Sequence, residues 1–174
     1  VSYGQFLDSL WSEWRGVDFS ARVAYTAPPP ASTPLVETVS IGRREPMVPA
    51  PATPIAPTLG PVQAPLVNGL GAFSTLTGVG LTPTLSWSAP ATGVPTSHLV
   101  QIYRLFASGT ASVSAPVASF AVAGASRQVV VPPGLLAAGN VYYARISARV
   151  IATGDAFDSA PFRTSNLWSE AQVL

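Results

Sequence analysis

Residues Leu136–Ala148 read Leu-Ala-Ala-Gly-Asn-Val-Tyr-Tyr-Ala-Arg-Ile-Ser-Ala, and this stretch decides the fold. Gly139 and Asn140 indicate a turn, because both residue types accept the backbone angles that tight turns require. After the turn, side chains with apolar character recur at every second residue, at Tyr142, Ala144, Ile146 and Ala148. A period of two is typical of a strand with one buried face. The stretch therefore predicts a sheet protein whose core lies on this side of the strand.

Six further segments have strand character. Within Thr84–Ser88, Leu85 and Trp87 are two residues apart, so both point to one face. Within His98–Phe106, the inward positions are Val100 and Ile102. The other expected strands are Gly71–Thr82, Val117–Val122, Arg127–Val131 and Asn166–Leu174. With the strand that follows Leu136, these give seven strands, and we predict an all-β sandwich.

Three short patterns resemble the fibronectin type III family. Leu136, Gly139 and Tyr142 match the corner before its sixth strand, with Ala138 and Asn140 in place of the usual Pro and Thr. The Leu-x-Trp-x-x-Pro run that starts at Leu85 is similar to the second strand, with its buried Trp. The run 167–170 is similar to the start of the last strand in bacterial members. The resemblance covers about residues 64–174 and implies a seven-stranded, immunoglobulin-like sandwich, a fold that hosts many unrelated functions.

The composition excludes several function classes. All nine basic residues are Arg, there is no Cys, and only 10% of the residues are charged. Absence of Cys excludes disulfides, thiolate nucleophiles and Cys-ligated zinc. The net charge is +1 and the arginines are scattered, so we expect no nucleic-acid partner. No stretch reaches the roughly 18 uninterrupted apolar residues of a spanning helix, so we expect no membrane span. Arg without Lys indicates a GC-rich, bacterial source.

The N-terminal part predicts a short helix and a hairpin. Apolar residues in Tyr3–Arg15 follow helical spacing, at Tyr3, Phe6, Leu7, Leu10, Trp11 and Trp14. An alternative stays open, because Leu10–Glu13 repeats the sequence of Leu167–Glu170 and could instead belong to a strand. Asp18–Thr26 and Leu35–Ile41 alternate as strands, and the prolines between them require a loop.

Prolines recur every two to four residues from Glu45 to Leu66, which favours extended polyproline II structure. We interpret this segment as a spacer that lies along a protein surface, with a ligand for an SH3-type domain as the alternative. The expected division is therefore residues 1–44 as a helix plus β-hairpin arm, 45–66 as a Pro-rich linker and 67–174 as the fibronectin type III-like sandwich.

The sequence predicts no catalytic, cofactor or metal residues. His98 is the one histidine, and a Ser-His-Asp hydrolase would need it, but it occupies an inward strand position and is expected to be a packing or edge residue. Asp155 and Asp158 are the best local metal ligands. Two carboxylates fall short of the six to eight oxygens that Ca²⁺ usually takes.

Three surfaces are candidates for binding. The loop 153–164 is the longest, and loops at the end of a sandwich often carry recognition residues. The N-terminal arm has large aromatic side chains, and the outward face of 98–106 is apolar, so that face either underlies the arm or meets another subunit. The candidate residues are Asp155, Phe157, Asp158 and Phe162 in the loop, Phe6, Trp11 and Trp14 in the arm, and Leu99, Tyr103 and Leu105 on the strand.

We therefore expect a non-catalytic structural or adhesion module of an extracytoplasmic bacterial protein, whether periplasmic, on the outer surface or secreted. One alternative is a subunit of a surface filament or multiprotein assembly that docks through its N-terminal arm. Another is an accessory domain of a secreted polysaccharide-degrading enzyme, because modules of the resembled family often accompany such enzymes. The expected partner is a protein or a neighbouring subunit, and carbohydrate stays open under the last alternative.

Overall fold

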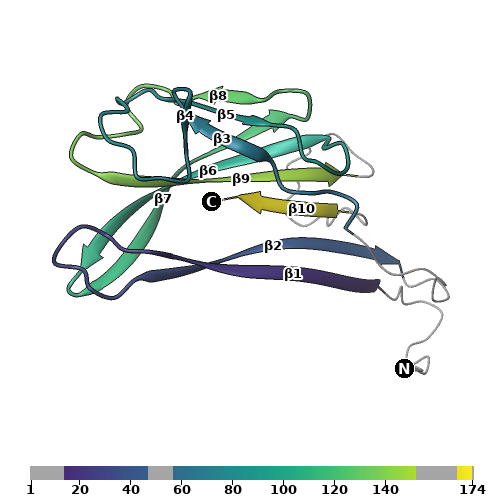
Figure 1. Ribbon diagram of the computed structural model, residues 1–174, viewed down its shortest axis with the longest axis horizontal. Helices are drawn as coiled ribbons and strands as arrows, with labels where there is room; N and C mark the ends of the chain where they lie inside the picture. Colours follow the sequence, from purple (N-terminus) through teal and green to yellow (C-terminus); the bar gives the residue numbers. More distant parts are fainter. Residues whose placement is uncertain (1–13, 47–56, 152–167, 174) are drawn as a thin grey trace.

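The computed structural model describes the backbone of residues 14–46, 57–151 and 168–173, and the side chains of 18–42 and 57–150. Within these residues the protein is all-β and contains no helix (Figure 1). The strands are β1 Trp14–Tyr25, β2 Leu35–Pro46, β3 Gln63–Val67, β4 Leu70–Gly71, β5 Thr84–Ser88, β6 Ser97–Ser108, β7 Ala111–Ala123, β8 Gln128–Val130, β9 Val141–Ile151 and β10 Trp168–Val173.

The strands form two antiparallel sheets that pack face to face. One sheet has the order β4-β3-β5-β8 and the other the order β1-β2-β10-β9-β6-β7. The buried core between them takes residues from both sheets and from the segment that precedes β3. It comprises Leu59, Val62, Leu85, Trp87, Val100, Ile102, Val131, Ile146 and Ala148. The alternation in the sequence therefore identified the core faces of β5, β6 and β9 correctly.

The corner before β9 is held by a side chain. Gly139 has φ of 77°, a conformation that glycine adopts without steric cost. The backbone N–H of Ala137 donates a hydrogen bond of 2.9 Å to the Tyr142 hydroxyl, and Leu136 packs against the core. The tyrosine thus closes the loop that brings the chain from β8 into β9.

The expected strand Gly71–Thr82 is wrong, because most of that segment is loop. The chain instead forms β3 eight residues earlier and turns at Asn68 and Gly69, whose φ angles are 50° and 81°. Val67 pairs with Leu70 across this two-residue turn, so β4 ends at Gly71. Two consecutive positive φ angles are typical of a type I′ turn, the hairpin turn that Asn-Gly favours. The prediction of a turn at Asn68-Gly69 is confirmed. The turn does not precede the sandwich, as expected, but connects two of its strands, β3 and β4.

The last part of the Pro-rich segment is not a spacer, as expected, but belongs to the sandwich. Residues 47–56 lie outside the described residues, but Leu59 is 0% and Val62 2% exposed, within the sandwich core. The Gly60 N–H donates to the Thr92 carbonyl at 2.9 Å, and a Cβ at Gly93 would clash with the carbonyl oxygen of Thr58. The last part of the segment is thus fixed against the loop after β5, because its apolar residues between prolines fill the core.

The expected hairpin is present and longer than predicted. β1 and β2 pair from Trp14↔Pro46 to Tyr25↔Leu35 without a register shift. The expected helix Tyr3–Arg15 lies outside the described residues except for its end, where Trp14 and Arg15 already belong to β1. β2 also pairs with β10, so the hairpin extends the sheet of the sandwich by two strands.

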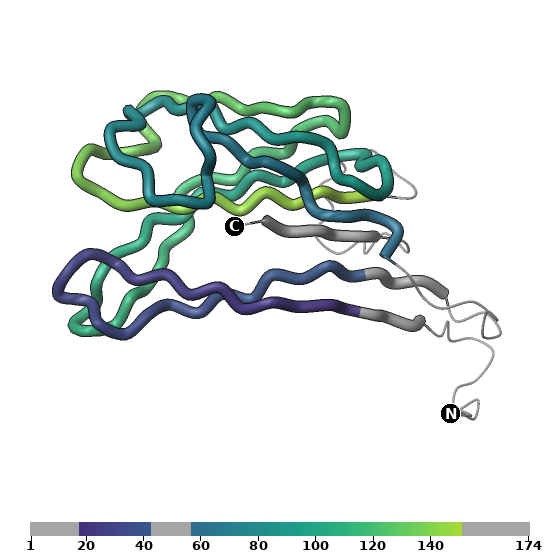
Figure 2. The backbone as a smooth tube through the Cα atoms, viewed as in Figure 1, coloured from purple at the N-terminus to yellow at the C-terminus, as the bar shows by residue number. Residues whose placement is uncertain are grey.

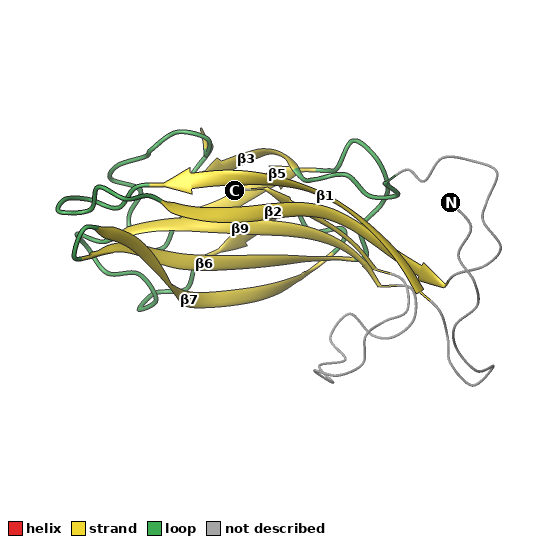
Figure 3. Ribbon diagram, turned by 90° about the horizontal axis from the view of Figure 1, so that it is seen from below, coloured by secondary structure: helices red, strands yellow, loops and turns green. Residues whose placement is uncertain are grey.

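The six-stranded sheet curves so that its two hairpin tips meet. The loop between β1 and β2 lies beside the loop between β6 and β7 (Figures 1 and 2), where Thr33 and Ala111 form an isolated bridge. Seen from below in Figure 3, β1 and β2 follow β9, β6 and β7 as one twisted layer. The β1–β2 hairpin therefore docks on its own sandwich, where Tyr25 and Glu37 contact β9 side chains that point away from the core.

Candidate functional site

The hairpin is attached to the sandwich through a stack of three tyrosines. The Tyr25 ring of β1 lies 4.7 Å from the Tyr143 ring of β9, at an interplanar angle of 14°. Tyr143 in turn stacks on Tyr103 of β6 at 5.1 Å and 11°. Strand β10 lies between β2 and β9, and its described pairing extends to Ala171 with β2 and to Val173 with β9. The stacked tyrosines join the hairpin to the sandwich farther along β9.

Glu37 of β2 supplies the polar contacts beside the stack. It accepts a hydrogen bond of 3.1 Å from the Tyr143 hydroxyl and one of 2.8 Å from Arg145 Nη2. The guanidinium of Arg145 also lies 5.7 Å from the centre of the Tyr103 ring. We call Tyr25, Glu37, Tyr103, Tyr143 and Arg145 the docking seam. Tyr103, Tyr143 and Arg145 alternate with core-facing residues along β6 and β9, so they lie on the strand faces that point away from the core.

Burial in the docking seam changes the acidity of its tyrosines. It raises the pKa of Tyr25 to about 12, and the neighbouring Tyr143 acts in the same direction. Burial also raises the pKa of Tyr143 above its usual value. Both rings are therefore neutral well above physiological pH. The docking seam holds two parts of the chain together, and neither of these tyrosines supplies a phenolate near neutral pH.

Backbone contacts fix the hairpin tip. The N–H groups of Ser32 and Thr33 donate to the Thr110 carbonyl at 2.8 and 2.9 Å, and Ser112 N–H donates to Thr33 O at 2.8 Å. The buried N–H of Ala27 donates to Ser112 Oγ at 2.9 Å. Buried amides that find such partners avoid a penalty of about 1–3 kcal/mol each, so the tip is well anchored.

The outward face of β6 is thus placed next to the arm. Tyr103 lies in the docking seam and Leu99 is half-buried. Leu105 is only 5% exposed and is not part of an open patch, because it lies at the end of the sheet where the hairpin tip contacts β7. Tyr103 stacks on Tyr143, and Tyr143 in turn stacks on Tyr25 of the hairpin, so this face adjoins the N-terminal segment through β9.

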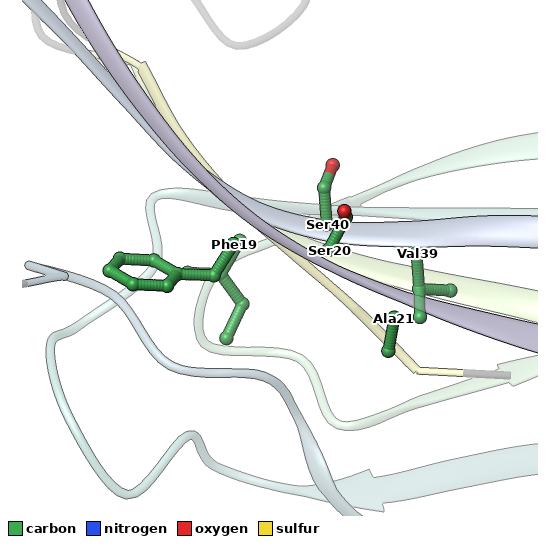
Figure 4. A pocket seen from close by; sticks show the side chains of 6 residues that line it. Phe19, Ser20, Ala21, Val39 and Ser40 are labelled. Carbon is green, nitrogen blue, oxygen red and sulfur yellow. The ribbon is translucent and has the colours of Figure 1, made fainter.

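A shallow hollow lies farther along the hairpin. It has a volume of about 290 Å³ and is lined by Phe19, Ser20, Ala21, Val39, Ser40 and Ile41. Ser20 and Ser40 point to one side of the hairpin, while Phe19, Ala21 and Val39 point to the other (Figure 4). Small-molecule sites are usually deeper, with polar groups that converge on the ligand. This hollow is better described as an exposed apolar strip on which Phe19 is 54% exposed.

The free edge of β1 differs from the other sheet edges. β4 has two residues and β8 three, too few to template another chain, while β7 contains Pro116 and a register shift opposite Ile102. β1 has 12 residues without Pro, Lys or a bulge, and within the described part of the chain it pairs only with β2. It is the long regular edge of the described sheets.

His98 is buried in the core, as its position in the sequence predicted. It is 1% exposed, and its ring lies 5.2 Å from that of Trp87, which is 4% exposed. Burial lowers the pKa of His98, an effect opposed in part by the backbone of Ala123 and reinforced by Arg127. A neutral imidazole enclosed by the core cannot reach a substrate.

Most other candidate residues cannot be placed. Asp155, Phe157, Asp158 and Phe162 lie outside the described residues, as do Phe6 and Trp11. Trp14 begins β1, at the pair with Pro46. The sequence-based reasoning missed Glu37, although a single carboxylate among Leu35, Val39 and Ile41 on one strand face was a visible sign of a buried polar contact.

The described residues contain no group of three or more His, Asp or Glu side chains placed to hold a metal ion. In the same part of the chain, no helix has the length and apolar character needed to cross a membrane. No protein-family model, curated protein or solved structure matches the chain. The functional argument therefore depends on the docking seam, the apolar strip and the free edge of β1.

Proposed function

We propose that this chain is a non-catalytic structural module of an extracytoplasmic bacterial protein, built on a fibronectin type III-like sandwich, and that it recognises protein through its extended sheet. Strands β3, β5 and β8 correspond in this interpretation to A, B and E, and β6, β9 and β10 to C, F and G. That distribution over two sheets agrees with immunoglobulin-like folds, as does the Tyr142 hydroxyl that bonds back to Ala137.

The observation that carries the proposal is the placement of the β1–β2 hairpin. It completes one side of the sandwich through the docking seam and the β2–β10 pairing. On its other side it leaves 12 residues of strand without a pairing partner among the described residues. A protein that adds two strands to a sheet and stops at a regular edge has the form of a module that binds further strands.

The chemistry of the described residues favours recognition over catalysis. His98, which a hydrolytic triad would need, is enclosed by the core. The titratable residues that do lie together, Glu37 and Arg145 with two tyrosines, hold the hairpin in place. Membership of a filament or multiprotein assembly is a second form of the same proposal, and the edge of β1 favours it. No contact among the described residues favours a carbohydrate ligand.

Site-specific photo-crosslinking tests the proposal. A photo-reactive amino acid at Ser20, an exposed position on β1, should crosslink to protein in cells of the source organism, whether to another protein or to a second copy. The matched control is the same group at Val94, which is 82% exposed in the loop after β5. Equal labelling from both positions, or no protein adduct from Ser20, would contradict recognition through β1.

A further inference from the structure

The charges of β1 are arranged in a way that is complementary to themselves. Asp18 and Arg22 are both exposed, and they lie on the same face of the strand, on either side of Ser20. Their cross-strand neighbours in the hairpin are the uncharged residues Gly42 and Thr38. Both side chains are exposed, and neither has an ion-pair partner among the described residues.

We propose that β1 binds β1 of a second copy of this chain, antiparallel and centred on Ser20, so that Asp18 of each copy lies opposite Arg22 of the other. This inference rests on the proposed function and specifies its partner. A two-fold axis at Ser20 brings residues 15–25 of the two copies side by side. It joins the two six-stranded sheets into one continuous sheet.

The register follows from the charges. An antiparallel pair centred on Asp18 places that carboxylate opposite its own copy, and a parallel pair in register repeats like charges at both positions. Opposite charges directly across a strand pair stabilise it by roughly 0.2–1 kcal/mol, and like charges destabilise it. A shift by one residue would also bring the polar and apolar faces of the two strands together. Of these arrangements, only the antiparallel pairing centred on Ser20 places Asp18 of each copy opposite Arg22 of the other, which gives two ion pairs.

The apolar face of the hairpin supports the same register. Phe19 and Ala21 alternate with the charged residues, so Phe19 of one copy lies opposite Ala21 of the other. The two Phe19 rings then become diagonal neighbours, a spacing that aromatic side chains can bridge. Phe19 is 54% exposed in the single chain and lies on the apolar strip with Val39 and Ile41. Pairing places Phe19 and Ala21 of the second copy beside this strip and so shields Phe19, which the single chain leaves exposed.

Sedimentation of the purified full-length chain tests the proposal, at low salt and over a range of concentrations. We expect a reversible monomer–dimer equilibrium that weakens as salt is added, because the two ion pairs are exposed. The variants D18R and R22D each convert both attractive pairs into repulsive ones. Each should raise the dimer dissociation constant about tenfold or more. Thermal unfolding should be close to wild type for both, since these exposed side chains have no ion-pair partner among the described residues.

Charge exchange provides the decisive comparison. The double variant D18R/R22D restores the complementarity with the signs reversed, and it should dimerise as the wild type does. A mixture of the D18R chain with the R22D chain should form a heterodimer, because every pair is then attractive, while each variant alone stays monomeric. A change in net charge alone would not restore dimerisation both in the double variant and in the mixture of the two single variants.

Several results would overturn the proposal. These are a wild type that stays monomeric over the whole range, single variants that dimerise normally, or a double variant that does not recover. Its failure is distinct from that of the proposed function. A monomeric chain that still crosslinks from Ser20 to a different protein keeps the binding role of β1 and assigns the edge to that protein. Loss of both results would refute recognition through β1 altogether.

Discussion

The docking seam leads to a measurable prediction, because one carboxylate, Glu37, supplies the polar contacts beside the tyrosine stack. Glu37 accepts one hydrogen bond from Tyr143 and one from Arg145. Removing it in Glu37→Ala deletes both and leaves the guanidinium without its counter-ion in a partly enclosed place. The stacked rings lose nothing directly, so the change isolates the polar part of the docking.

The magnitude follows from the exposure of the pair. A hydrogen bond to a charged group contributes about 1.5–3 kcal/mol when it is well shielded. Here the side chains of Arg145 and Glu37 are 15% and 24% exposed, so solvent screens part of the ionic attraction. We therefore expect Glu37→Ala to lower the free energy of hairpin opening by about 2 kcal/mol, which raises the open population about thirtyfold.

Hydrogen exchange measures this opening residue by residue. Amides of β1 and β2 should exchange about thirtyfold faster in Glu37→Ala, while those of β5 and β6 should change much less. Glu37→Gln is the matched variant, since it keeps the shape of the side chain and one acceptor oxygen. Its exchange rates in β1 and β2 should lie between those of the wild type and those of Glu37→Ala. Unchanged exchange in the hairpin, with β5 and β6 equally unaffected, would show that Glu37 does not hold the hairpin.

Three further predictions concern the core and the titratable groups. Trp87→Ala should cost about 3–5 kcal/mol and lower the melting temperature by about 6–20 °C for a chain of this length. Trp87→Phe should cost less, because it keeps an aromatic ring in the core and leaves a smaller cavity, while both variants remove an indole N–H that has no partner among the described residues. A Trp87→Ala melt within about 2 °C of wild type would contradict the burial. Burial lowers the pKa of His98 in the folded chain, so the unfolded chain binds the proton first as the pH falls. The free energy of unfolding should therefore decrease as the pH drops below 6.5, until the pH reaches the pKa of the folded chain. His98→Gln should abolish this part of the pH dependence in urea unfolding, and an identical dependence in both proteins would refute it. For Tyr25, whose pKa is raised to about 12, the unfolded chain loses its proton first, so docking should weaken between pH 10 and pH 12. Tyrosinate absorbance should show a late-ionising group that is missing in Tyr25→Phe, and a single titration step near pH 10 would exclude the burial of that ring.

The sandwich core was predictable because its signals are local. Strands β5, β6 and β9 each repeat apolar side chains at every second residue, and Trp87, Val100 and Ile146 are buried as expected. The alternation fixes which face is apolar before any partner strand is known. The corner at Tyr142 could be recognised for the same reason, since its turn, its glycine and its tyrosine lie within a few residues of one another.

The predictions for Gly71–Thr82 and for the end of the Pro-rich segment were wrong because a local sequence signal is compatible there with two different structures. Asn68-Gly69 marks a turn, but only the space left in the other sheet decides that β3 precedes it and that Gly71–Thr82 becomes loop. Proline spacing at 45–66 argues against a helix. It does not reveal that Leu59 and Val62 complete the core, because burial depends on what the rest of the chain leaves open.

The sequence alone therefore determined that this is a sheet protein, which residues form the core faces, and that its one histidine is enclosed. Only the tertiary structure decided that the hairpin docks in cis, that Glu37 meets Arg145 across 108 positions of sequence, and that β1 becomes an edge. Backbone period and turn chemistry act between near neighbours along the chain. Sheet order and docking depend on which distant strands bury the most surface together, a competition that no local pattern records.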